Sequence, residues 1–102
     1  GFSNGANAAG ALLLLHPDAV RGVVAFGTTK SFIKTPFGKQ APNLAGKRVW
    51  IANGEVDGYS PADRTQAMVA EFTELGASVE LLMHPGGHTI VPSHVQKIAS
   101  QL

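Results

Sequence analysis

Ser3, Asp57 and His88 are the residues of this chain whose side chains could act together in a reaction. A serine hydroxyl becomes a nucleophile when a histidine removes its proton, and a carboxylate orients that histidine. The stretch Gly1-Phe2-Ser3-Asn4-Gly5 fits the G-x-S-x-G pattern of a nucleophile on a sharp turn between a strand and a helix. These residue types therefore indicate nucleophilic catalysis by a Ser-Asp-His triad.

Two glycines flank the candidate nucleophile, at positions 1 and 5. The turn that carries such a nucleophile is sharp, and glycine tolerates an unusual backbone better than any other residue. We therefore expect a side chain at Gly1 or at Gly5 to clash with the neighbouring chain.

The serine and the aspartate each have an ordinary structural interpretation as well. Ser3 could simply begin a helix, and Asp57 could cap a turn, as aspartates often do. Glu55 is a second carboxylate close to Asp57 in the sequence. On the residue types alone, either carboxylate could serve as the partner of the histidine.

Three other histidines compete with His88 for the role of the base. His16 ends a predicted helix, where a histidine interacts favourably with the helix dipole. His84 and His94 are expected at the surface or behind the site. A metal site of His84, His88 and His94 is an alternative, but these spacings match no established zinc motif. We expect neither a metal ion nor a cofactor.

The helices and strands that must position these residues follow from the apolar pattern. Residues 5–15 predict a buried helix that ends at Pro17 and Asp18. Ser60 is expected to cap a further helix, with Pro61 at its first position and Gly76 as its stop. A last helix is predicted over residues 92–101. The predicted strands are residues 21–26, 48–53 and 78–83, the first two of them buried on both faces.

The predicted order of elements is helix, strand, loop, strand, helix, strand, helix, which indicates an α/β fold with a parallel sheet. Functional groups in such sheets lie just beyond the carboxyl ends of the strands. Asp57 follows strand 48–53, His88 follows strand 78–83, and Ser3 precedes the first helix. We therefore expect all three along one edge of one sheet.

The segment from Thr28 to Lys47 has no regular period and is longer than a plain connection. Its basic residues could attract an anionic acyl substrate or could simply be solvated, and they are Lys30, Lys34, Lys39, Lys47 and the adjacent Arg48. Its large apolar residues could line an acyl pocket or pack onto the helices, and they are Phe32, Ile33 and Phe37.

Size and charge limit the class of protein. A chain of 102 residues forms at most one domain, and a net charge of +1 gives no reason to expect nucleic acid or a membrane surface as a partner. The longest apolar run is shorter than the roughly 20 residues of a membrane span. There is no cysteine, which excludes disulfides and thiolate chemistry and is compatible with the cytoplasmic location that we expect.

Three segments together resemble the C-terminal half of a carboxylesterase/phospholipase-type α/β-hydrolase. Acyl-thioesterase-like and dienelactone-hydrolase-like enzymes are near neighbours of that group. The segments are GFSNGA, LAGKRVWIANGEVDGYSP and FTELGASVELLMHPGGHTI. They contain, in order, the nucleophile turn, a G-x-x-D-x-x-x-P motif and a Gly-Gly-His motif. The second motif favours Asp57 over Glu55, and the order Ser, Asp, His along the chain is also that of α/β-hydrolases.

The resemblance implies a function and a role for each matched residue. Ser3 would be the nucleophile, His88 the general base and then acid, and Asp57 the carboxylate that fixes the imidazole tautomer. The backbone N–H of Asn4 would be one oxyanion-hole donor. The implied reaction is hydrolysis of a small-molecule carboxylic ester or thioester through an acyl-enzyme, without a cofactor.

The same resemblance implies that part of the fold is absent. Residues 1–102 would form a single partial α/β-hydrolase domain that lacks the N-terminal half, including the loop with the second oxyanion donor. Strand 21–26 would then expose an apolar edge, which invites pairing with a second copy or a complementary chain. The alternative function is a non-catalytic α/β fragment or subunit that needs a complementary chain for activity.

Overall fold

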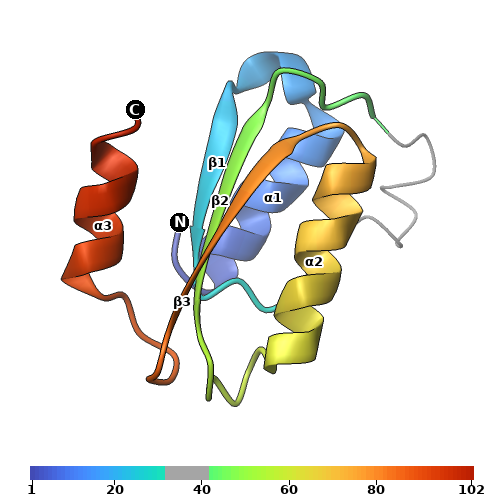
Figure 1. The fold of residues 1–102 in the computed structure, drawn as a ribbon. Coiled ribbons are helices and arrows are strands. Elements are labelled where there is room, and N and C mark those ends of the chain that lie inside the picture. Colours follow the sequence, from blue (N-terminus) through green and yellow to red (C-terminus); the bar gives the residue numbers. More distant parts are fainter. Residues whose placement is uncertain (32–41) are drawn as a thin grey trace.

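The computed structural model describes residues 1–31 and 42–102, and it confirms the predicted order of helices and strands. Each observed boundary lies within two residues of the predicted one. The elements are α1 (Asn4–Leu15), a short 3-10 turn η1 (Pro17–Ala19), β1 (Gly22–Phe26), β2 (Arg48–Gly54), α2 (Ala62–Glu74), β3 (Ser78–His84) and α3 (Pro92–Ala99), as Figure 1 shows. The residues Phe32, Ile33, Phe37, Lys34 and Lys39 of the long loop lie outside the described residues.

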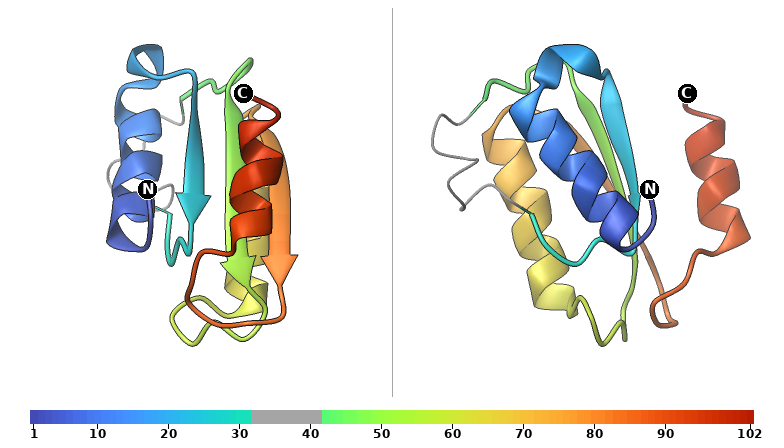
Figure 2. Two further views of the ribbon diagram at one scale, coloured as in Figure 1. Left: turned by 90° about the vertical axis from the view of Figure 1, so that its left-hand side faces the viewer. Right: turned by 180° about the vertical axis from the view of Figure 1, so that it is seen from behind.

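The three strands form one parallel sheet in the order β1-β2-β3, as predicted. Helices α1 and α2 cover one face of this sheet, and α3 lies on the opposite face (Figures 1 and 2). Because all strands run the same way, their carboxyl ends meet at one edge. The connections that follow β2 and β3 therefore lie side by side there, next to the start of α1.

The main hydrophobic core lies between the sheet and the two helices α1 and α2. Leu13 of α1 and Met68 and Phe72 of α2 pack against alternate residues of the strands, such as Val49 and Ile51. Burying side chains of this size contributes about 1.5–3 kcal/mol each. This core fixes α1, and with it the position of Ser3 at the start of that helix.

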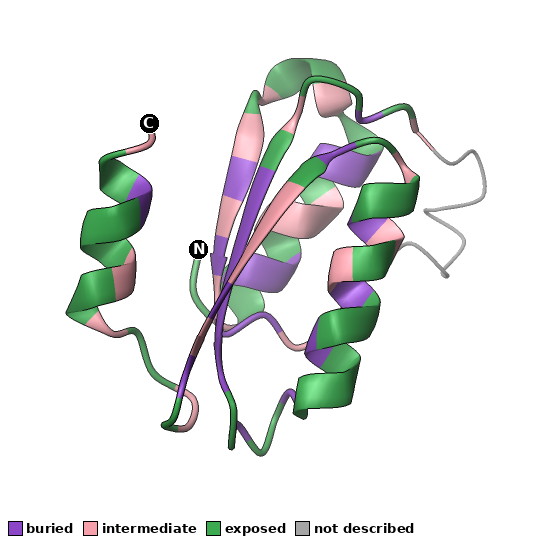
Figure 3. Cartoon of the chain, viewed as in Figure 1, coloured by how far each residue is buried: buried purple, intermediate pink, exposed green. Residues whose placement is uncertain are grey.

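A smaller core on the other face explains a difference from the prediction for β1. Ile98 of α3 packs with Trp50, Ala52 and Leu82, which belong to β2 and β3. Strand β2 is therefore buried almost throughout, whereas β1 alternates between buried and half-buried residues (Figure 3). The prediction that both faces are buried is correct for β2 and wrong for β1.

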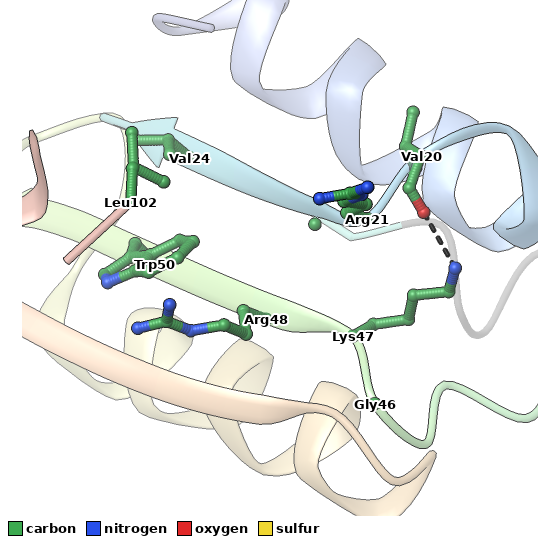
Figure 4. A pocket seen from close by; sticks show the side chains of 9 residues that line it. Val20, Arg21, Val24, Gly46, Lys47, Arg48, Trp50 and Leu102 are labelled. Atoms are coloured by element: carbon green, nitrogen blue, oxygen red, sulfur yellow. Dashed lines mark hydrogen bonds between the residues drawn. The ribbon is translucent and has the colours of Figure 1, made fainter.

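A hollow of about 700 Å³ lies on the face of the sheet that carries α3, where β1 is less covered (Figure 4). Val24, Trp50 and Leu102 line it together with two cations, Arg21 and Arg48. The guanidinium of Arg48 stacks over the Trp50 ring at 4.3 Å and donates a hydrogen bond to the Gln101 carbonyl. The hollow contains none of Ser3, Asp57 and His88.

The start of α2 differs from the prediction, whereas its end agrees. The helix begins at Ala62 after Pro61, and no side chain caps it. Ser60, the predicted cap, is buried and places its hydroxyl 3.2 Å from the Thr65 hydroxyl instead. Gly76 has a φ of +102°, the left-handed backbone that stops the helix as expected.

The outer edge of β1 is partly occupied by the first residues of the chain. Phe2 forms a parallel bridge with Phe26, and the Gly1 amino group donates to the Val24 carbonyl at 2.8 Å. The turn that carries Ser3 is thus held by the end of β1. In the described part of the chain, no helix has both the length and the apolar content that crossing a bilayer requires.

Candidate active site

The structure brings Ser3, His88 and Asp57 together in one hydrogen-bonded chain. The Ser3 hydroxyl lies 2.9 Å from Nε2 of His88, and Nδ1 of the same ring lies 2.7 Å from Oδ2 of Asp57. When Nδ1 carries the proton and donates to the carboxylate, Nε2 is free to accept the proton of the serine. The Asp57 side chain is buried, while the histidine ring is partly open to solvent.

Ser3 has the backbone geometry of a sharp turn. Its φ of 56° is positive, which no other non-glycine residue in the described ranges shows. A conformation of this kind costs about 1–3 kcal/mol and needs support from its surroundings. That support comes from the Ser3 amide, which donates to the Phe26 carbonyl at 2.9 Å, and from the Asn7 amide, which donates to the Ser3 carbonyl at 3.0 Å.

The two flanking glycines turn out to differ. A Cβ atom on Gly1 would overlap the carbonyl of Gly5 and would lie 2.7 Å from the Ala6 nitrogen, so the expectation for Gly1 is confirmed. A Cβ atom on Gly5 would meet no described heavy atom within 4 Å, so the expected clash there is wrong. The reason is that Gly5 lies on the exposed side of the first turn of α1.

Asp57 is placed by a tight turn at the end of β2. Its amide donates to the Gly54 carbonyl at 3.3 Å, and its Oδ1 accepts the Tyr59 amide at 2.8 Å. A Cβ atom on Gly54 would overlap the carbonyl oxygens of Gly86 and Gly87, so glycine lets the loop with His88 approach closely. Glu55, the rival carboxylate, is exposed, and the carboxylate that pairs with the His88 ring is that of Asp57.

His84 holds the loop that carries His88 from both sides. Its Nδ1 accepts the Gly86 amide at 3.1 Å, so Nε2 carries the proton and donates to the Thr89 carbonyl at 3.2 Å. His84 is buried, so the expectation of a surface position is wrong. The other expected position, behind the site, agrees with its burial. The rings of Phe2 and Tyr59 lie about equally close to His88, at 5.1 and 5.0 Å.

We predict that replacing His84 by leucine lowers kcat for the ester hydrolysis that the sequence resemblance implies by about 10- to 100-fold, with a smaller change in KM. Without the two hydrogen bonds, the loop no longer holds the His88 ring in line, and a displacement of about 1 Å can cost as much as 100-fold in rate. Steady-state kinetics on a short-chain methyl ester measures this split. The matched control is the exposed His16→Leu, and equal kinetics in both variants would contradict the positioning role.

Two buried asparagines fix the segment after β1, and neither was predicted from the sequence as a functional residue. Asn7 of α1 accepts the Thr28 hydroxyl and the Thr29 amide at its Oδ1, each at 2.9 Å. Asn53 accepts the Thr28 amide at 3.2 Å and donates to the Thr28 carbonyl and to the Thr65 hydroxyl, both at 3.0 Å. The sequence signal that could have identified them is a polar residue inside an apolar strand, as for Asn53, or inside a helix of small residues, as for Asn7.

His94 lies beside His84, and its electrostatics follow from that position. The ring centroids are 5.5 Å apart. Partial burial, and then the electrostatic effect of the neighbouring His84, lower the pKa of His94, although a hydrogen bond with the Met83 backbone acts in the opposite direction. Across residues 1–31 and 42–102, no three His, Cys, Asp or Glu side chains lie close enough together to bind a metal ion.

A pocket of about 460 Å³ opens next to the candidate triad. This volume is in the range of about 300–1,000 Å³ that small-molecule sites occupy. Ser3 and His88 line it, together with Asn4, Thr29, Lys30, Tyr59 and Arg64. Asn4 is the first residue of α1, a position whose amide has no acceptor within the helix. Its N–H is therefore available beside the serine.

Comparison with known proteins supports the class of fold. No family model matches the chain. A curated protein of Bacillus subtilis (strain 168), described as "Putative hydrolase MhqD", is 26% identical over 97 residues, which are 95% of this chain and 46% of that protein.

Solved structures are similar over almost the whole chain. The Bacillus cereus carboxylesterase has a TM-score of 0.88 at 30% identity and covers 99% of this chain and 46% of its own. The carboxylesterase from Mesorhizobium loti has a TM-score of 0.83 at 31% identity, with the same coverage of both chains.

The parallel sheet, the flanking helices and these similarities define the fold as that of the carboxylesterase-type α/β-hydrolases, which confirms the resemblance expected from the sequence. A phospholipase/carboxylesterase from Dyadobacter fermentans is a further similar structure, with a TM-score of 0.81 at 25% identity. The chain spans a little under half the length of the relatives that it matches. The fold does not by itself define a chemical reaction, which depends on the residues of the site.

Proposed function

We propose that the chain is the catalytic part of a serine esterase, with Ser3 as nucleophile, His88 as base and Asp57 as its orienting carboxylate. The observation that carries this proposal is the continuous hydrogen-bonded path from the Ser3 hydroxyl through both nitrogens of His88 to Asp57. The positive φ of Ser3 supports it, because a strained turn at a polar residue is typical of a nucleophile.

The proposed reaction has two halves, which use the same groups in opposite directions. In the first, His88 Nε2 takes the Ser3 proton while Oγ forms a bond to the ester carbonyl carbon. The ester bond then breaks, and His88 returns that proton to the leaving alcohol. In the second half, His88 takes a proton from water, whose oxygen attacks the acyl-enzyme. The acid leaves, and Ser3 recovers its proton.

The negative charge that develops on the carbonyl oxygen needs donors close to Ser3. We propose the Asn4 backbone N–H as one of them, because it is the first amide of α1 and lines the same pocket as the serine. The positive end of the helix dipole adds to this stabilisation. Removing one such donor typically costs about 10²–10³ in rate, so a second donor would matter as much.

The test of the proposed function is the pre-steady-state time course with p-nitrophenyl acetate. An acyl-enzyme that forms faster than it hydrolyses releases a burst of p-nitrophenol equal to the enzyme concentration. Mass spectrometry of the quenched protein should then find an acetyl group on the peptide that contains Ser3. A folded protein with neither burst nor acetylated Ser3 would instead favour the alternative, an α/β module that needs a complementary chain.

A further inference from the structure

The pocket beside Ser3 is positively charged. Of the residues that line it, Lys30 and Arg64 are cations, and none is an aspartate or a glutamate. Asp57, the nearest carboxylate of the candidate site, is buried behind His88 and hydrogen-bonded to it. A substrate in this pocket therefore meets two cationic side chains and no carboxylate among the lining residues.

Arg64 is held across the pocket by the two loops that border it. It lies in the first turn of α2, and its Nη1 approaches the Thr29 carbonyl at 3.4 Å and the Tyr59 carbonyl at 3.5 Å. Both contacts involve the same nitrogen, Nη1, whereas a guanidinium group has five N–H donors in all. Among the described residues, the ion pairs are His88–Asp57 and Lys97–Glu80, so Arg64 has no carboxylate partner there.

We infer that the substrate carries a carboxylate, which Arg64 binds while Ser3 attacks the ester. This inference rests on the proposed function and adds the substrate class. A planar guanidinium binds a carboxylate through two parallel hydrogen bonds, an arrangement that a neutral ester cannot reproduce. Lys30 adds positive charge to the same pocket. The chemistry thus indicates a half-ester of a short dicarboxylic acid.

The kinetic test compares monomethyl succinate with methyl 4-methylpentanoate, a neutral ester of nearly the same shape, by NMR detection of released methanol. We expect kcat/KM to favour the charged ester, and Arg64→Gln to lower the ratio of the two values about tenfold. The control Arg21→Gln removes the same charge at the opposite end of β1 and should leave the ratio unchanged. Equal ratios in the wild type and Arg64→Gln would overturn the inference.

A binding experiment separates this inference from the proposed function. The Ser3→Ala protein is titrated with monomethyl succinate while the backbone amide signals of Thr29 and Tyr59 are followed by NMR. Saturable shifts that disappear in Ser3→Ala/Arg64→Gln, and that weaken with added salt, support the carboxylate site. No saturable shift would overturn it even if esters are hydrolysed. Saturable binding to Ser3→Ala, together with no hydrolysis of either ester by the wild-type protein, would retain the site and reject the esterase function.

Discussion

Replacing Ser3 by alanine is expected to lower kcat for ester hydrolysis by about 10⁴- to 10⁶-fold, the range in which loss of a triad serine falls. Alanine keeps the Cβ atom and removes the hydroxyl that lies 2.9 Å from His88, so the proposed nucleophile is lost while the turn is retained. The measurement is steady-state hydrolysis of a short-chain ester, with circular dichroism to verify that the variant is folded.

The control for this variant is Ser93→Ala, which removes an exposed serine from the first turn of α3. It should retain the activity of the wild type. If Ser3→Ala hydrolyses the ester within tenfold of the wild-type rate, Ser3 is an ordinary helix-start serine.

The second large effect is expected for Asp57→Asn, which should lower kcat by about 10⁴-fold. An asparagine amide group can donate to Nδ1 of His88, which stabilises the tautomer with its proton on Nε2. That proton then blocks acceptance of the Ser3 hydroxyl proton. Because Asp57 is buried and also accepts the Tyr59 amide, water cannot easily replace the lost carboxylate.

Glu55→Gln is the matched control, since it changes the rival carboxylate two residues earlier in the chain. Glu55 is exposed, and we expect the rate of this variant to stay within twofold of the wild type. Comparable losses in the two variants, or a larger loss in Glu55→Gln, would reject Asp57 as the partner of His88.

The sheet and the proximity of Ser3, Asp57 and His88 could be predicted because each depends on a local pattern. Short apolar runs at positions 21–26, 48–53 and 78–83 each form a strand of the parallel sheet. Once the strands are parallel, their carboxyl ends coincide, and residues such as Asp57 and His88 that follow two of them must meet. Their proximity in the fold could therefore be predicted although these residues are far apart in the sequence.

What could not be predicted depends on tertiary partners. In the sequence, Asn7 and Asn53 look like interruptions of apolar segments. Their structural role is visible only in the folded chain, where both side chains form hydrogen bonds with Thr28. His84 is indistinguishable in sequence from a surface histidine until the loop folds back to place Gly86 and Thr89 beside it. Gly5 fits the pattern around a nucleophile, yet no described atom lies close enough to require glycine there.

The burial of β1 shows the same dependence on position in the sheet. Its sequence is as apolar as that of β2, but α3 packs on β2 and β3 instead. The half-buried residues Val24 and Phe26 share the less covered face of β1, and Val24 lines the hollow there (Figure 4). Composition predicts that a strand is apolar, whereas the neighbouring elements decide how much of it is buried.

The most direct test of the proposed nucleophile is labelling with a fluorophosphonate, which reacts with an activated serine and hardly with an ordinary one. Intact-mass spectrometry should find one phosphonyl group per chain on the wild type, and none on Ser3→Ala or His88→Ala. A chain that circular dichroism shows to be folded and that remains unlabelled would contradict an activated Ser3. The hydrogen-bonded path to Asp57 would then be a structural feature without catalytic use.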